Sequence, residues 1–114
     1  MNGFCLAGTC TNQVESIEHI LISCPAYSAV RDRLKLLWLS STDATIREIV
    51  SKAMCDPPQM LLQFLLDCSV IPTVISAAQC YGQGVYDTLF YLTRTWCFSV
   101  HRERLKVLNR WNFR

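Results

Sequence analysis

The chain has 114 residues, of which 51% are hydrophobic and 18% charged, and its formal net charge is +2. This apolar content excludes a disordered chain, and the length is that of one domain with a single modest core. A large catalytic domain is excluded as well. The excess of apolar over charged residues predicts apolar surface left over once the core is filled, and therefore a partner or the remainder of a longer protein.

The sequence predicts an intracellular protein, in the nucleus or cytoplasm. The first 14 residues carry no charge and so lack the basic start of a secretory signal. The longest uncharged run, residues 68–86, contains Pro72, Gly82 and Gly84, which favours core and turn over a membrane span. Seven cysteines without a secretory signal predict reduced thiols, serving as buried filler or as metal ligands.

Apolar spacing predicts an all-α fold, a small helical bundle that forms one compact unit. After a cysteine-bearing loop, helices are expected at residues 12–24, 26–39, 44–54, 60–66, 72–80 and 85–111. Residues 60–66 are almost wholly apolar and fit a buried strand or a buried helix, and their Leu, Met and Gln content favours the helix. In the last helix, Leu89, Trp96 and Val100 belong to a stripe spaced by three and four residues.

Three cysteines and one histidine fall within 20 residues near the start of the chain. The pattern is Cys5-x4-Cys10-x8-His19-x4-Cys24. Zinc prefers four such ligands in a tetrahedron, and a loop pair followed by a pair on a helix and at its end can supply them. The alternative is that the cysteines are ordinary buried residues and that His19 lies on a helix surface.

This segment resembles the zinc-binding segment downstream of the polymerase domain in reverse transcriptases of non-LTR retrotransposons. The family pattern is a cysteine pair, then Glu-(Ser/Thr)-x-x-His-x-Leu-x-x-Cys-Pro, then a helix with arginine. The match consists of Glu15-Ser16, Glu18-His19, Leu21, Cys24-Pro25 and Arg31. The first cysteine pair is separated by four residues here, and more often by two in the family. The resemblance implies a structural, CCHC zinc knuckle-like site with no open position for substrate.

A second block is similar to the tail of some animal elements of this kind. It comprises residues 64–67, 89–97 and 101–105. The resemblance therefore implies a zinc segment with its following helix at residues 1–39 and a helical tail at residues 40–114. It also implies a non-catalytic piece that helps hold RNA or DNA for an upstream polymerase domain. The sequence agrees in lacking the adjacent Asp pair that polymerases use for two metal ions.

Charge is concentrated at the end of the chain. Residues 1–93 carry net −3, whereas the last 21 residues carry net +5. The candidate contacts to a nucleic-acid backbone are Arg94, Arg102, Arg104, Lys106, Arg110, Trp111 and Arg114. Basic side chains neutralise phosphates, and the interleaved Trp96, Phe98, Trp111 and Phe113 could stack on unpaired bases. The alternative is a solvated helix whose Trp96 faces the core and whose basic groups complement the helix dipole.

Other interpretations stay open. Cys97 and His101 are neighbours on the predicted last helix, but no orienting carboxylate accompanies them, which favours packing over catalysis. No catalytic residues and no membrane contact are expected. The chain could instead be a helical protein-protein interaction module that docks a partner through apolar surface around residues 60–66. It could also be the product of a decayed retroelement with no selected function.

Overall fold

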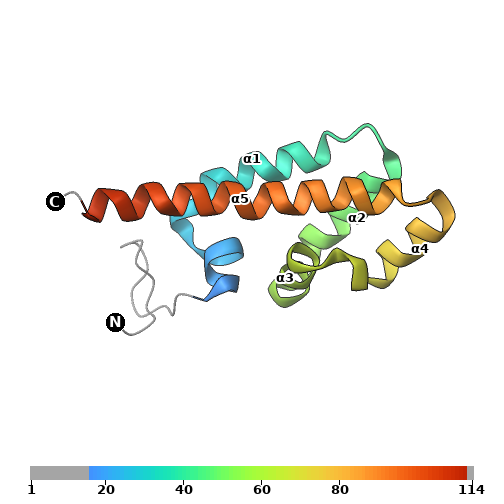
Figure 1. Cartoon of the computed structure of the whole chain (residues 1–114), viewed down its shortest axis with the longest axis horizontal. Coiled ribbons are helices and arrows are strands. Elements are labelled where there is room, and N and C mark those ends of the chain that lie inside the picture. The colour runs from blue at the N-terminus through green and yellow to red at the C-terminus, as the bar shows by residue number, and fades with distance from the viewer. Residues whose placement is uncertain (1–15, 113–114) are drawn as a thin grey trace.

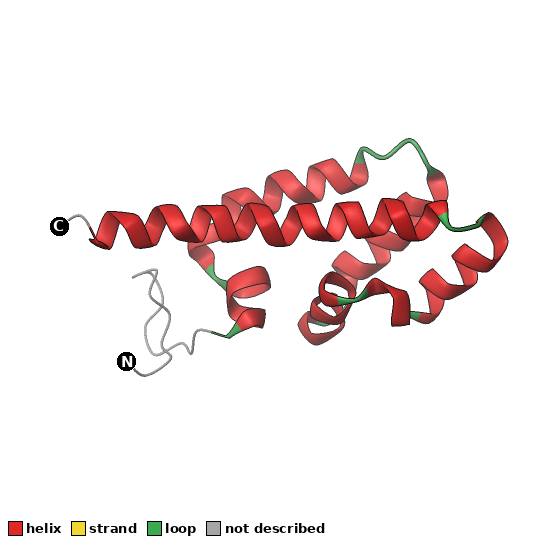
Figure 2. Ribbon diagram, in the orientation of Figure 1, coloured by secondary structure: helices red, strands yellow, loops and turns green. Residues whose placement is uncertain are grey.

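The computed structural model describes residues 16–112, with side chains as far as Asn109. Its elements are η1 (His19–Ser23), η2 (Pro25–Tyr27), α1 (Ser28–Leu39), α2 (Ala44–Cys55), α3 (Pro58–Leu66), η3 (Cys68–Val70), α4 (Pro72–Tyr81) and α5 (Gly84–Asn112). η1 is a π-helical turn, and η2 and η3 are 3-10 turns. Figure 2 shows only helices and loops over residues 16–112, so the all-α prediction is confirmed.

The long helix α5 is the spine of the molecule (Figure 1), which measures 53 × 22 × 19 Å. α5 contacts every other element of the described chain, with α1 alongside it, α2 to α4 at its N-terminal half and η1 further along. The predicted stripe of α5 is buried at Leu89, Trp96 and Val100. One face of a single helix thus organises the core.

Three aromatic rings meet where α1, α3 and α5 pack together. The centroids of the Trp38 and Trp96 rings are 4.8 Å apart, and Phe64 meets Trp38 edge-on at 5.7 Å. The Trp96 indole N–H donates a hydrogen bond of 3.0 Å to the Leu21 carbonyl. Aromatic rings bury more area than other side chains, and the indole needs a partner once it is buried, so this contact also fixes η1 against α5.

The helix boundaries follow from local chemistry. Asp43 caps α2, where its carboxylate accepts hydrogen bonds from the backbone N–H groups of Thr45 (2.9 Å) and Ile46 (3.3 Å). Pro58 and Pro72 open α3 and α4, at positions where a missing N–H costs nothing. Gly82 ends α4 with φ 95°, a conformation that other residues rarely adopt.

The predicted buried face of residues 26–39 is partly wrong. The spacing of Val30, Leu34 and Leu37 by three and four residues predicts that they share the core face, with Arg31 among the basic residues that lie mostly on other faces. In the structure Leu37 is exposed and Arg31 is buried. Trp38, four residues after Leu34, takes the core position in place of Leu37. The larger ring gains more from burial, which rotates the buried face by one residue.

Residues 60–66 are helical, as the Leu, Met and Gln content predicts. Leu61, Phe64 and Leu65 point into the core, whereas Met60 and Leu66 are exposed. The apolar surface expected here for a protein partner is therefore reduced to two side chains.

In the described part of the chain, no helix is both long enough and apolar enough to cross a membrane.

The buried thiol of Cys68 makes the stability of the fold decrease as the pH becomes alkaline. Burial raises the pKa of Cys68 from an ordinary 9.0 to about 11, with a smaller contribution from the charge of Asp67. Because the pKa is higher in the folded state, this contribution to stability is complete below about pH 9 and is lost as the pH rises towards 11. Two pKa units correspond to about 2.7 kcal/mol.

We therefore expect the free energy of unfolding, measured in urea between pH 8 and 11, to fall more steeply for the wild type than for Cys68→Ala. The alanine variant removes the titrating thiol but starts from lower stability because it leaves a cavity. Equal slopes for the two proteins would contradict the assignment.

Candidate metal centre and nucleic-acid interface

His19 and Cys24 are the two predicted zinc ligands that lie within the described residues, and a π-helical turn joins them. The Cys24 backbone N–H donates a hydrogen bond of 2.7 Å to the His19 carbonyl, five residues earlier. In an α-helix, side chains five residues apart diverge by about 140°. A π-turn closes one residue later, so the fifth residue returns closer to the side of the first.

The His19 side chain is buried, with only 8% of its surface exposed. Its Nε2 has no hydrogen-bond partner among the described residues. Trp38 Nε1 and Arg31 Nη1 are likewise buried without a hydrogen-bond partner in the described chain, but of these atoms only the histidine nitrogen can bind a metal ion. Because His19 is buried, the prediction that it lies on a helix surface is wrong, whereas the burial of Cys24 fits both a metal ligand and an ordinary buried cysteine.

The first two predicted ligands, Cys5 and Cys10, lie outside the described residues. Within residues 16–112, no three His, Cys, Asp or Glu side chains are grouped as a metal site would require. His19 and Cys24 are therefore half of the predicted quartet. Cys24 itself is fully buried, which suits a structural ligand.

Arg31 lies near Cys24, a neighbour that the periodicity of α1 did not predict. Arg31 is 7% exposed as a residue, and its Nη1 has no hydrogen-bond partner in the described chain. Burial lowers the pKa of Arg31, while the charges of Cys24 and Asp32 raise it. In the sequence, the feature that could have drawn attention to Arg31 was its place shortly after Cys24-Pro25.

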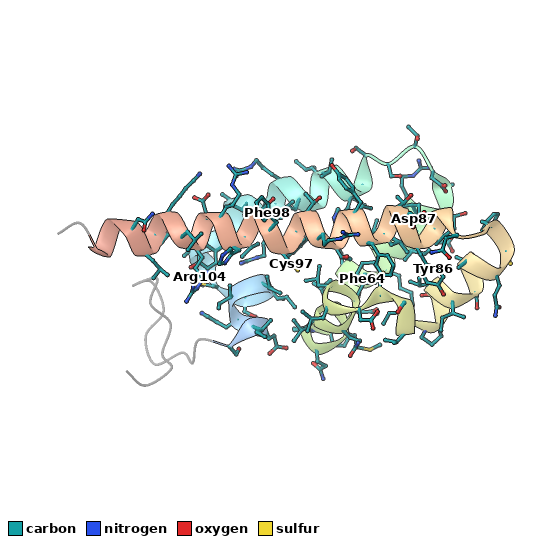
Figure 3. The ribbon with its side chains drawn as sticks, viewed as in Figure 1. Phe64, Tyr86, Asp87, Cys97, Phe98 and Arg104 are labelled. Atoms are coloured by element: carbon teal, nitrogen blue, oxygen red, sulfur yellow. The ribbon has the colours of Figure 1, made fainter. Side chains whose placement is uncertain are left out.

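The predicted phosphate contacts on α5 fall into different environments. Arg94, Arg102 and Lys106 are exposed, and Lys106 pairs with Glu103 at 3.5 Å. Arg104, labelled in Figure 3, is half-buried. It lines a pocket together with residues of η1. Arg104 therefore presents less of its charge to a ligand in solution than the other three.

The remaining predicted contacts lie at the end of the chain. Arg110 and Trp111 belong to the last turn of α5, and their side chains are outside the described set. Arg114 and the neighbouring Phe113 lie outside the described residues altogether.

The aromatic residues of α5 divide between core and solvent. Trp96 is fully buried and faces the core, so its ring is unavailable for stacking on a base. Phe98, labelled in Figure 3, is 61% exposed. The Arg102 guanidinium lies 5.7 Å from its ring centroid. Tyr91, which the sequence analysis did not single out, is 65% exposed on the same helix. Its position seven residues before Phe98 could have shown that the two rings share one face of the helix.

Cys97 and His101 do not form an activated pair. Burial raises the pKa of the Cys97 thiol, which keeps it protonated at neutral pH, whereas His101 is exposed.

No protein-family model, curated protein or solved structure matches the chain. The functional interpretation therefore depends on the chain's own side chains, above all His19, Cys24 and the exposed face of α5.

Proposed function

We propose that the chain is a non-catalytic, nucleic-acid-binding module stabilised by structural zinc, equivalent to a C-terminal part of a non-LTR retrotransposon reverse transcriptase. It would contact the RNA or DNA backbone for an upstream polymerase domain. The observation that carries the proposal is the buried His19 imidazole, whose Nε2 lacks a hydrogen-bond partner in the described chain. Cys24, five residues later, is buried as well.

The residues that would hold the zinc ion are Cys5, Cys10, His19 and Cys24. With four protein ligands the ion has no open position, so it would stabilise the fold and supply no reaction chemistry. The buried Arg31 supports this ligand set, because three thiolates and one divalent ion leave a net negative charge that a neighbouring cation offsets. Zinc would thereby fix the first segment to the turn that Trp96 already anchors.

The partner is proposed from charge. After Asp87, the only acidic residue of α5 is Glu103, and it is already paired with Lys106. Arg94 and Arg102 form no ion pair within the described chain, so both can meet phosphates. Phosphate contacts supply affinity without sequence selection.

A protein-interaction module is the second candidate, and exposed leucines favour it. Leu36, Leu37 and Leu39 are all exposed at the end of α1. Leu36 and Leu39, three residues apart, share one side of the helix and could form the centre of a docking patch.

A salt titration separates the two candidates. Binding of a labelled oligonucleotide, followed by fluorescence anisotropy, should weaken steeply as salt rises, whereas apolar docking holds or strengthens. Replacing Arg94 and Arg102 together by glutamine should reduce the slope of log K against log salt by about 1.4 to 1.8.

The matched control for the titration is the double replacement of Arg33 and Lys35, two exposed cations on α1, by glutamine. It removes the same charge and should leave the slope almost unchanged. Equal effects of the two double variants would overturn the assignment to α5, and absence of binding at low salt would overturn the nucleic-acid function.

A further inference from the structure

The face of α5 that points away from the core carries a row of aromatic and basic side chains. Tyr91, Arg94, Phe98 and Arg102 follow one another at helical spacing, and we name this row the α5 outer stripe. Tyr91, Arg94 and Phe98 line one open hollow together with Thr95. The buried stripe that contains Trp96 occupies the opposite side of the helix.

Both rings of the stripe leave most of their surface in water, since Tyr91 is 65% and Phe98 61% exposed. Exposed aromatic rings in a row lose apolar hydration only when a ligand covers them. Each ring is followed by an arginine that has no acidic partner in the described chain, and Arg102 already lies over the Phe98 ring. The stripe therefore offers apolar faces and positive charge in alternation.

This alternation matches an unpaired nucleotide strand better than a duplex. Bases in a duplex are covered on both faces by their neighbours, whereas bases of a single strand can stack on aromatic rings. Tyr91 and Phe98 are seven residues, or about 10 Å, apart along the helix. Stacked bases lie about 3.4 Å apart, so each ring would meet a different base. Asp87, one turn before Tyr91 and exposed, would repel phosphate and so limits the site at that end.

We propose that the α5 outer stripe binds single-stranded RNA or DNA, with bases stacked on Tyr91 and Phe98 and phosphates held by Arg94 and Arg102. This inference rests on the proposed nucleic-acid function and goes beyond it, because backbone contacts alone do not distinguish a single strand from a duplex.

The test compares binding of fluorescein-labelled oligothymidylate and oligouridylate with binding of a labelled duplex, by anisotropy at low salt. The full chain should prefer the single strands. Tyr91→Ala and Phe98→Ala should each weaken single-strand binding by about tenfold, and duplex binding by much less. Phe98→Tyr should keep the affinity, whereas Phe98→Leu should lose it, because leucine is apolar but does not stack.

The matched control is Tyr81→Ala at the end of α4, where Tyr81 is 70% exposed and off the stripe. It should bind like the wild type. If Tyr91→Ala and Phe98→Ala also bind like the wild type, or if Tyr81→Ala weakens binding equally, the stripe is not the site although the proposed function stands. If the wild type binds neither single strands nor duplex, the proposed function fails as well.

Discussion

Replacing His19 by alanine is expected to abolish retention of one zinc ion per chain and to lower the melting temperature. Loss of an outer hydrogen-bond partner of a metal ligand already costs 10- to 100-fold in affinity, so loss of a ligand should cost more than about 100-fold. With free zinc at about a thousand times its dissociation constant, a bound ion would stabilise the fold by about 4 kcal/mol, which would raise the melting temperature by roughly 15–30 °C. Native mass spectrometry gives the metal content, and thermal unfolding with and without chelator gives the shift.

His101 provides the matched control, because it is the second histidine of the chain and is exposed on α5. His101→Ala should keep its zinc and should respond to chelator as the wild type does. Since His19 is buried, its replacement also leaves a cavity, and lowered stability alone does not establish a metal site. A wild-type chain that purifies without zinc and ignores added zinc would overturn the proposal.

Replacing Trp96 by alanine should cost about 3–5 kcal/mol of unfolding free energy. The substitution removes a fully buried indole from its contact with Trp38 and leaves the Leu21 carbonyl without its donor. Denaturation in urea, followed by far-UV circular dichroism, measures the loss as a shift of the midpoint.

Phe98→Ala, two residues further along α5, is the control for the tryptophan. Phe98 is exposed, so its loss should change stability by no more than about 0.5 kcal/mol. A comparable loss from both substitutions would mean that α5 packs through a different face.

The helices and the buried stripe of α5 were predictable because strong periodicity and clear stop signals coincide there. Leu89, Trp96 and Val100 repeat at helical spacing, and the proline and glycine residues between helices mark their ends. In α1 the pattern was ambiguous by one residue, since Leu37 and Trp38 are both apolar. Tertiary packing decided in favour of the larger ring, and periodicity carries no information about that choice.

The candidate site was only partly predictable. Ligand types and the turn-ending Pro25 are visible in the sequence, but the π-turn between His19 and Cys24 is not, because π-turns have no simple residue pattern. Burial of Arg31 was missed because a charged residue is normally assigned to the solvent face. Tyr91 was missed because an exposed aromatic looks the same as a buried one until the helix is placed against its neighbours.

The contact between Trp96 and the Leu21 carbonyl joins residues 75 positions apart, and α5 touches every other described element. During synthesis on the ribosome the chain emerges from its first residue, so the earlier helices wait with uncovered apolar faces until residues 84–112 have been made. Nascent chains stalled before that point should bind chaperones and be cleaved readily by protease. Resistance to the protease should appear in one step once α5 has been made.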